Sequence, residues 1–294
     1  MPQELLRYPP VYCLVGIYRL ATQPGLRGPI WDKCRHGVRR GAVVGAFWTV
    51  FTFNAQRAFV AFFLLNSPRV TALAQNSFFG YKVPLATYAT VMFLSSQFTY
   101  ILQFFLSRNL KIARERAWAQ TVKSRGKTDD FWVPYVEEWE VPPQVDIERP
   151  RWEKWIGPWA VRLLFRRVVL LPFNFVPFLG LAFSAALKGI STARYLHKPY
   201  FEAKKMTPVQ VAVFMEERKW DYRMFGFVAA LLESIPIVGL ALTISNRIGA
   251  CMWAYDLEKR QHRFLAGELK PANLSRLVSE PSSIEMKDFR KASK

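Results

Sequence analysis

The sequence predicts an all-α integral membrane protein, with two long transmembrane helices and two Pro-x-x-Gly helical hairpins that partly penetrate the bilayer. Three observations predict this class. Several runs of about twenty residues carry almost no charge, which is the length that a helix needs to cross a hydrocarbon core. The Lys and Arg residues are concentrated between these runs, and two of the runs contain a Pro-x-x-Gly sequence near their middle.

The charge of the chain favours a membrane over other partners. Of 294 residues, 51% are hydrophobic, 41 are Lys or Arg, and 22 are Asp or Glu, which gives a net charge of +19. Such a charge also occurs in nucleic-acid-binding proteins. Here, however, the cations are not gathered into one patch but flank the apolar runs, as cations do beside an anionic membrane surface. We therefore expect membrane lipids as partners and no nucleic acid.

The first half of the chain predicts an N-terminal amphipathic segment, residues 1–40, followed by a spanning helical pair, residues 41–106. The pair consists of the apolar runs 41–65 and 83–106, joined by the short loop 66–82. Positive residues favour the cytoplasmic side of a membrane. Seven Lys or Arg residues precede the pair and only two lie in its loop. We therefore expect the loop on the far side and both termini in the cytoplasm.

The second half predicts three further segments. Residues 107–160 are expected to form a cytoplasmic connector, which begins with a basic helix over residues 108–125. Residues 161–265 form a tandem hairpin region, and residues 266–294, rich in Ser, Glu and Lys, a disordered tail. Three tryptophans of the connector indicate a belt at the level of the lipid headgroups: Trp152, Trp155 and Trp159.

The hairpins are predicted from the distribution of positive charge. If the apolar runs 168–187 and 224–246 each crossed the membrane once, residues 188–223 would lie on the far side. That segment holds eight Lys or Arg residues, which contradicts the orientation rule. A run that folds back on itself keeps the cations in the cytoplasm. Two kinked spanning helices with a basic far-side loop are the alternative.

The hairpin tips are predicted at two matching Pro-x-x-Gly sequences. Pro177 and Gly180 lie in the first run, and Pro236 and Gly239 lie 59 residues further along. Proline ends a helix at the preceding residue, and glycine accepts turn dihedrals. Each run is therefore expected to form two helices that meet at its tip.

Two charges are expected at membrane depth, Arg57 and Glu233. Charges in such positions usually face the interior of a helix bundle or a cavity. One hypothesis is that the two side chains pair with each other or line a polar path. The other is that Arg57 extends to the far interface and that Glu233 is neutral or hydrogen-bonded to a neighbouring turn.

Sequence motifs for catalysis or metal binding are lacking. The three histidines are scattered, and neither a nucleophile elbow nor a phosphate-binding glycine loop occurs. Cys13, Cys34 and Cys251 lie far apart, which favours buried, reduced thiols over a metal site. S-acylation of Cys13 or Cys34 is the alternative. We expect no enzymatic activity and no cofactor.

A turn near the N-terminus is a candidate site for a small anion. Gly25, Leu26 and Arg27 follow Pro24, so that a Pro-Gly turn leads into a helix start. Free backbone N–H groups at such a start and the charge of Arg27 can together hold an oxyanion. The alternative is an ordinary interfacial turn with Arg27 on a lipid phosphate.

Several segments resemble a known family of membrane proteins. Residues 16–27, GIYRLATQPGLR, resemble the opening of the CysZ family, the bacterial inner-membrane sulfate permeases. Four later segments are similar to the related eukaryotic etoposide-induced ER-membrane protein family, above all to its fungal branch of lipid-droplet and outer-spore-wall membrane proteins. They are YLHKPYFE at residues 195–202, FGF at 225–227, ESIP at 233–236 and GACMWAYDLEK at 249–259.

The resemblance implies a fold of two long spanning helices and two partly penetrating hairpins. It also implies a non-enzymatic protein of the endoplasmic reticulum (ER) and lipid droplets that supports droplet or spore-wall processes. The alternative is a permease for a sulfate-like anion, since the Gly-Leu-Arg turn contributes to sulfate binding in the permeases. In this chain Gly28-Pro29 follows Arg27 in place of a second basic or bulky residue. A homo-oligomer is compatible with both functions.

Overall fold

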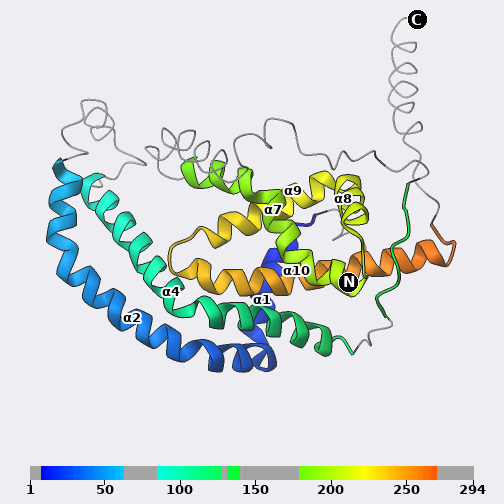
Figure 1. The fold of residues 1–294 in the computed structure, drawn as a ribbon, viewed down its shortest axis with the longest axis horizontal. Helices are drawn as coiled ribbons and strands as arrows, with labels where there is room; N and C mark the ends of the chain where they lie inside the picture. The colour runs from blue at the N-terminus through cyan, green and yellow to red at the C-terminus, as the bar shows by residue number, and fades with distance from the viewer. Residues whose placement is uncertain (1–7, 63–84, 127–130, 140–142, 144–178, 270–294) are drawn as a thin grey trace, which may run out of the picture. The chain divides into compact units, whose positions relative to one another are not determined.

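The computed structural model describes residues 8–62, 85–126, 131–139, 143 and 179–269. The regular structure of these residues is helical and contains no β-strand, which confirms the all-α class (Figure 1). The helices are α1 (Val11–Thr22), α2 (Pro24–Val60), α4 (Leu85–Ser124), α7 (Leu179–Ala203), α8 (Pro208–Glu217), α9 (Lys219–Glu233) and α10 (Val238–Leu265).

The described residues divide into two compact units. The helix-pair unit comprises the described residues of 14–124 and 229–249, and contains α2 and α4. The aromatic unit comprises those of 1–13, 125–228 and 250–294, and contains α7 and α8. Helices α1, α9 and α10 contribute residues to both units.

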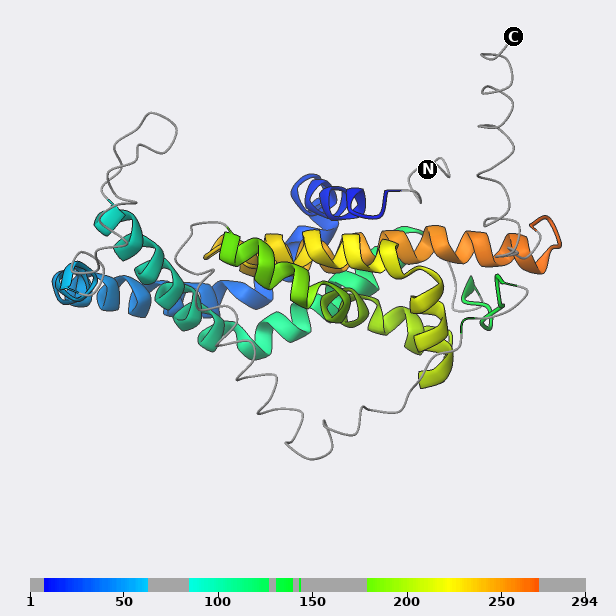
Figure 2. The ribbon, with the colours of Figure 1, turned by 90° about the horizontal axis from the view of Figure 1, so that it is seen from above.

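Helices α2 and α4 run side by side in opposite directions (Figures 1 and 2). Three glycines of α2, spaced four residues apart, face large side chains of α4. A Cβ atom at Gly37 would lie 2.8 Å from Leu106 Cδ2, and one at Gly45 would lie 2.7 Å from the ring of Phe98. Gly41 lies against Leu102 in the same way. The glycines therefore allow a close approach of the helices, as in the small-residue stripes of membrane helix pairs.

The antiparallel pairing gives the helix pair one basic end and one apolar end. The first half of α2 lies beside the last half of α4, and in these halves cations outnumber the two acids, Asp32 and Glu115. The cations are Arg27, Lys33, Arg35, Arg39, Arg40, Arg108, Lys111, Arg114, Arg116 and Lys123. The described residues at the opposite end, 41–62 and 85–107, contain a single charge, that of Arg57.

Most large side chains at the apolar end are exposed. Only one stripe of α2 is buried there, because α4 covers one side of it. The exposed set is Val43, Val44, Phe47, Trp48, Val50, Phe51, Phe53, Phe59, Phe62, Val91, Phe93, Tyr100 and Phe104. Phe51 is 79% exposed and Phe104 77%. Exposed apolar surface of this extent is typical of an interaction surface.

The basic end of the pair is packed around a small hydrophobic core. Helix α10 contributes Ile244 and Ile248 to it, while α2 and α4 contribute the other buried members: Leu26, Ile30, Cys34, Leu106, Leu110, Ala113 and Ala117. At the other end the pair is joined by a polar contact. The side-chain carbonyl of Gln97 in α4 accepts hydrogen bonds from Trp48 Nε1 at 2.8 Å and from Gln56 Nε2 at 2.7 Å.

The chain turns sharply at the second Pro-x-x-Gly sequence. Helix α9 ends at Glu233 and α10 begins at Val238, so that Pro236 lies in the turn. Gly239 has no room for a side chain, because a Cβ atom would collide with the carbonyl of Glu233. Ile237 has a φ of 64°, a conformation that is costly for a β-branched residue. Its N–H donates to Thr99 Oγ1 at 2.9 Å, a bond that holds the tip.

Within the part of the chain that the structure describes, no helix combines the length and apolarity required to cross a bilayer. Several predictions lie outside the described residues: the loop 66–82, the headgroup belt of Trp152, Trp155 and Trp159, the first tip at Pro177, and most of the C-terminal tail. The predicted basic helix 108–125 is the second half of α4, which continues from the apolar run without a break.

Candidate functional site

The second half of α7 has two chemically different faces in the aromatic unit. One face, which includes His197 and Tyr200, is buried, and so is Lys204 directly after the helix. The other face carries exposed polar side chains, among them Arg194 and Lys198. The spacing of three or four residues places each set along one side of the helix. The buried face packs against α10 and holds α7 in place, and the exposed face lines a pocket.

The buried face of α7 is bound to Glu258 of α10. Lys204 Nζ lies 2.8 Å from Glu258 Oε2, and the side chains of both residues are fully buried. The hydroxyl of Tyr200 donates to the same carboxylate at 2.9 Å, and the backbone N–H of Val133 donates to it at 2.7 Å. The carboxylate therefore has donors on both oxygens, which a buried charge requires.

A second buried carboxylate, Glu138, lies in the segment 131–139. It forms ion pairs with Arg218 and Arg260, and it accepts a hydrogen bond from Gln261 Nε2 at 2.6 Å. The Gln261 amide also bonds the N–H and the carbonyl of Val136 at 3.0 and 3.1 Å. The segment 131–139 is thus attached to α10 by side chains that satisfy its backbone.

Burial shifts the pKa of several groups in this network. It lowers the pKa of Lys204, an effect that the carboxylate of Glu258 partly offsets. It raises the pKa of Tyr200 well above its ordinary value, and the nearby Glu258 adds to this shift. Burial also raises the pKa of Glu217, which accepts hydrogen bonds from Arg218 and Tyr135. Burial therefore favours the neutral form of these groups, and a nearby opposite charge partly offsets this effect.

His197 occupies the centre of the aromatic core in a defined tautomer. Its Nε2 lies 3.1 Å from the carbonyl oxygen of Ala250, and its Nδ1 lies 2.8 Å from the hydroxyl of Tyr222. A carbonyl oxygen only accepts, so Nε2 carries the proton and Nδ1 accepts from Tyr222. The ring packs on Trp253 with 4.5 Å between centroids. Both nitrogens are therefore used within the core and do not face a substrate.

A pocket of about 430 Å³ lies between α7 and α8 in the same unit. Its polar lining comes from α7: Ser191, Arg194, Tyr195, Lys198 and Glu202. Its remaining lining is apolar and comes from the end of α7, the turn after it and the start of α8: Phe201, Met206, Pro208 and Val211. This size lies in the range of sites for small molecules.

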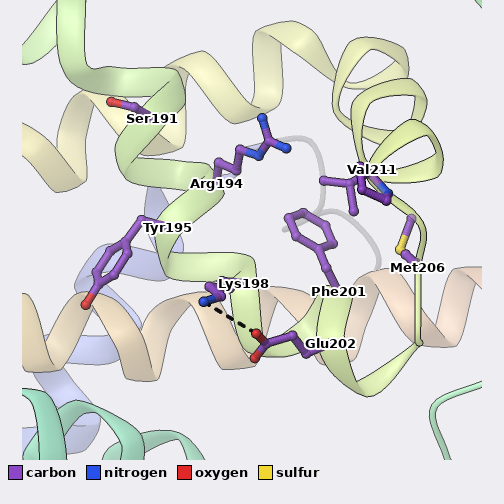
Figure 3. Close-up of a pocket in the computed structure, with 9 residues that line it drawn as sticks. Ser191, Arg194, Tyr195, Lys198, Phe201, Glu202, Met206 and Val211 are labelled. Atoms are coloured by element: carbon purple, nitrogen blue, oxygen red, sulfur yellow. Dashed lines mark ion pairs between the residues drawn. The ribbon is translucent and has the colours of Figure 1, made fainter. Parts of the chain in front are cut away.

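Figure 3 shows how the polar side chains are placed in this pocket. Arg194 extends from the side of α7 on which Phe201 and Val211 also lie, whereas Tyr195 points to the other side. Lys198 forms an ion pair with Glu202, with 3.5 Å between Nζ and Oε1. The pocket therefore combines one extended cation, one paired cation and an apolar wall.

The turn that joins α7 and α8 fixes the shape of the pocket. Lys205 adopts the left-handed conformation, with a φ of 54°, and Met206 donates back to the carbonyl of Phe201 at 3.0 Å. These features form a Schellman-type end of α7. Thr207 then caps α8 in a reciprocal capping box with Gln210.

The predicted anion-binding residues lie in the first turn of α2. Leu26 is buried in the core of the helix-pair unit, and Arg27 is exposed. Gly25 is exposed as well, and a Cβ atom there would meet no other atom within 4 Å. Gln23 precedes the helix without a side-chain cap. An anion site at Gly25, Leu26 and Arg27 remains a prediction.

The other predicted residues are spread over the chain. Gly180 lies in the first turn of α7, and Arg57 is exposed near the end of α2. Glu233, at the end of α9, accepts a hydrogen bond from Asn246 Nδ2 at 3.1 Å, which agrees with the hypothesis of a hydrogen-bonded Glu233. The thiols of Cys13, Cys34 and Cys251 are all buried, as expected. Burial raises the pKa of the Cys34 thiol, which reduces its reactivity.

Sequence reasoning missed the pocket and the network beneath it. Lys204 and Glu258 are 54 residues apart in the chain, and Val136 and Glu138 are 125 and 123 residues from their partner Gln261 in α10. Two signals were present, the polar residues at helical spacing in 191–202 and the carboxylate of Glu258 shortly after the apolar stretch 248–255. Neither signal indicates which distant residues these side chains contact. Among the described residues, no cluster of His, Cys, Asp or Glu could hold a metal ion.

No protein-family model, no curated protein and no solved structure matches this chain.

Proposed function

We propose that this chain is a non-enzymatic integral membrane protein of the ER and lipid-droplet system, embedded through the apolar end of the α2–α4 pair. One observation carries the proposal. The antiparallel pair presents thirteen large exposed apolar side chains at one end and ten cations at the other. Lipid contact stabilises the first end, and the anionic headgroup region stabilises the second.

The packing of the pair supports the same proposal. Gly37, Gly41 and Gly45 let the backbone of α2 approach α4 closely. Helices in lipid associate through such small residues, because lipid tails compete with large apolar side chains for contact. The pair also shares the hydrogen bonds of Gln97, which suit an apolar surrounding. The resemblance to the ER and lipid-droplet family provides the choice of organelle.

The membrane proposal is tested by carbonate extraction of the full chain expressed in cells. The double change Phe47→Lys and Phe51→Lys adds two charges to the apolar end, and each costs about 2.5 to 3.5 kcal/mol in a hydrocarbon environment. We expect this variant to move into the extracted fraction. A single aromatic-to-lysine change at the basic end, Trp31→Lys, should remain in the pellet, as should the wild type. A wild-type protein that carbonate extracts completely would refute the proposal.

The proposed topology is tested by cysteine labelling in sealed microsomes. The three native thiols are buried, so new cysteines can be introduced with little background. Lys205→Cys, at an exposed position, should be labelled from outside, because both hairpins keep their flanks in the cytoplasm. Ser77→Cys, in the loop 66–82, should be labelled only after the membrane is permeabilised. The reverse pattern at Lys205→Cys would refute the hairpins in favour of two kinked spanning helices.

The organelle is tested by fluorescent tagging with and without oleate loading of the cells. We expect a reticular ER signal, part of which moves to the droplets when oleate is supplied. A signal confined to the plasma membrane would refute this part of the proposal and would favour a permease at the cell surface.

A further inference from the structure

We propose that the pocket between α7 and α8 binds the headgroup of a phosphate-monoester lipid, that is, a lipid of the phosphatidate type. This inference deepens the proposed function, because a membrane protein has such lipids at hand. It depends on the pocket alone, however, and so can be tested apart from membrane insertion.

The charges of the pocket match a phosphate monoester. Arg194 extends into the pocket, and its planar guanidinium can bond two phosphate oxygens at once (Figure 3). Lys198 lies one turn further along α7 and lines the same pocket. A phosphate monoester carries nearly two negative charges at neutral pH, whereas a carboxylate carries one. Two cations on one wall therefore favour the phosphate.

The ion pair of Lys198 can be exchanged at little cost. Its partner Glu202 lies four residues away on the same helix, and the two side chains are 67% and 64% exposed. Exposed pairs of this kind contribute little to stability. A phosphate in the pocket can thus recruit Lys198 from Glu202. In the absence of the ligand, Glu202 shields this cation and weakens the pocket for anions.

The apolar wall distinguishes a lipid from free phosphate. The accessible part of this wall is Met206 and Pro208, which lie beside the nearly buried Phe201 and Val211. Free phosphate would leave this wall in contact with water. The first carbons of an esterified glycerol backbone and its acyl chains would cover it, which gains free energy in proportion to the apolar area removed from water.

The frame of the pocket is rigid enough to hold a headgroup in place. The buried ion pair between Lys204 and Glu258 holds the C-terminal end of α7 against α10. The capping box at Thr207 fixes the first residue of α8. Binding therefore orders only the exposed side chains of Arg194 and Lys198, which keeps the entropic cost of association small.

The test is a calorimetric titration of the full chain in amphipol with dihexanoyl phosphatidate, which is short enough to dissolve as a monomer. Dihexanoyl phosphatidylcholine tests the need for an exposed monoester, and inorganic phosphate tests the need for the apolar part. We expect saturable binding of the phosphatidate that is at least about tenfold tighter than binding of either comparison ligand. Equal binding of inorganic phosphate, or no saturable binding of the phosphatidate, would overturn the proposal.

Three variants assign the binding to this pocket. Arg194→Gln removes the charge but keeps a polar side chain, and it should weaken phosphatidate binding about tenfold, the loss expected for charge-assisted hydrogen bonds. Glu202→Gln releases Lys198 and should tighten binding several-fold, a gain that misfolding cannot produce. Arg223→Gln is the control, because Arg223 is also exposed but packs over Trp220 outside the pocket. An equal loss in Arg223→Gln and Arg194→Gln would overturn the proposal, since it would show attraction by overall charge.

The outcome is independent of the proposed membrane location. If carbonate removes the wild-type protein from membranes while the titration succeeds, the membrane proposal fails and the lipid site stands. If the protein resists extraction but the titration fails, the opposite conclusion holds.

Discussion

The helix-pair unit and the aromatic unit are both helical, but they are held together by different physical means. In the helix-pair unit, glycines of α2 meet large side chains of α4, and many apolar residues remain exposed. In the aromatic unit, charged side chains such as Lys204 and Glu258 are fully buried and paired. The first arrangement suits lipid as a solvent, where close packing drives association. The second arrangement, in which buried charged groups pair with one another, suits a unit whose interior excludes water.

The difference predicts which substitutions each unit tolerates. Close packing against glycine is sensitive to added volume and indifferent to charge elsewhere on the helix. A buried ion pair is sensitive to the loss of one partner, because the other charge is then left in an apolar surrounding. The following four changes test this contrast, in order of decreasing expected effect.

Glu258→Ala should cause the largest loss of stability. It leaves the ammonium group of Lys204 buried without a counter-charge and removes the acceptor of Tyr200, which together should cost about 3 to 5 kcal/mol. The measurement is thermal unfolding followed by tryptophan fluorescence. The double change Lys204→Met and Glu258→Leu should recover most of the loss, since it removes both charges. If Glu258→Ala unfolded at the wild-type temperature, the pair would have no structural role.

Gly41→Leu should have the next largest effect, this time in the helix-pair unit. The new side chain has to displace Leu102 or move the two helices apart, and overpacking of this kind costs about 1 to 3 kcal/mol. Val43→Leu, two residues along α2 at a position that is 65% exposed, adds apolar volume without a clash and is the matched control. Disulfide cross-linking between cysteines introduced on α2 and α4 measures the separation. Equal cross-linking in both variants would contradict the close approach at Gly41.

Thr207→Ala should have a smaller effect, because the capping box is local and exposed. Its loss removes one cap of α8 and should cost about 1 kcal/mol. Thr207→Ser, which retains the hydroxyl, should restore most of that stability. Hydrogen exchange of the first amides of α8 provides a direct measurement, and the amide of Gln210 should exchange faster in the alanine variant. Unchanged exchange there would show that tertiary contacts alone hold the helix.

The pH dependence of stability should show the smallest effect. Burial raises the pKa of Glu217 above its ordinary value of 4.5, so the folded chain binds this proton more readily than the unfolded chain. In the interval between 4.5 and the raised pKa, stability should therefore fall as the pH rises. Burial raises the pKa of Asp221 as well, which acts in the same direction. Glu217→Gln should flatten the profile of unfolding temperature above pH 4.5, and an unchanged slope would contradict the raised pKa.

The helical class and the second tip could be predicted from the sequence because they depend on local rules. Long uncharged runs predict helices, and Pro236 with Gly239 predicts the turn that the structure shows between α9 and α10. The glycine stripe on α2 was also readable, as three glycines at a spacing of four, but its partner on α4 was not. Nothing in a single helix indicates which large side chains it will meet.

The candidate pocket could not be predicted because its parts are brought together by distant contacts. Arg194 and Lys198 look like an ordinary solvated face of α7 when they are considered alone. They line a pocket because the turn at Lys205 brings the chain back to Phe201, while Lys204, directly after α7, pairs with a carboxylate of α10. Burial and pairing at long range are decided by the packed fold rather than by spacing along the chain.

The hydrogen bonds of Gln97 have a consequence for the register of the α2–α4 pair. A slide of one helical turn would still bring Gly37 opposite Leu102 and Gly41 opposite Phe98, so the glycine stripe by itself accepts more than one alignment. The same slide would carry Gln97 away from Trp48 and Gln56, and their polar groups would lose this acceptor. The glycines of α2 thus allow the two helices to approach closely in more than one register, and the hydrogen bonds of the Gln97 side chain favour the register that the structure shows.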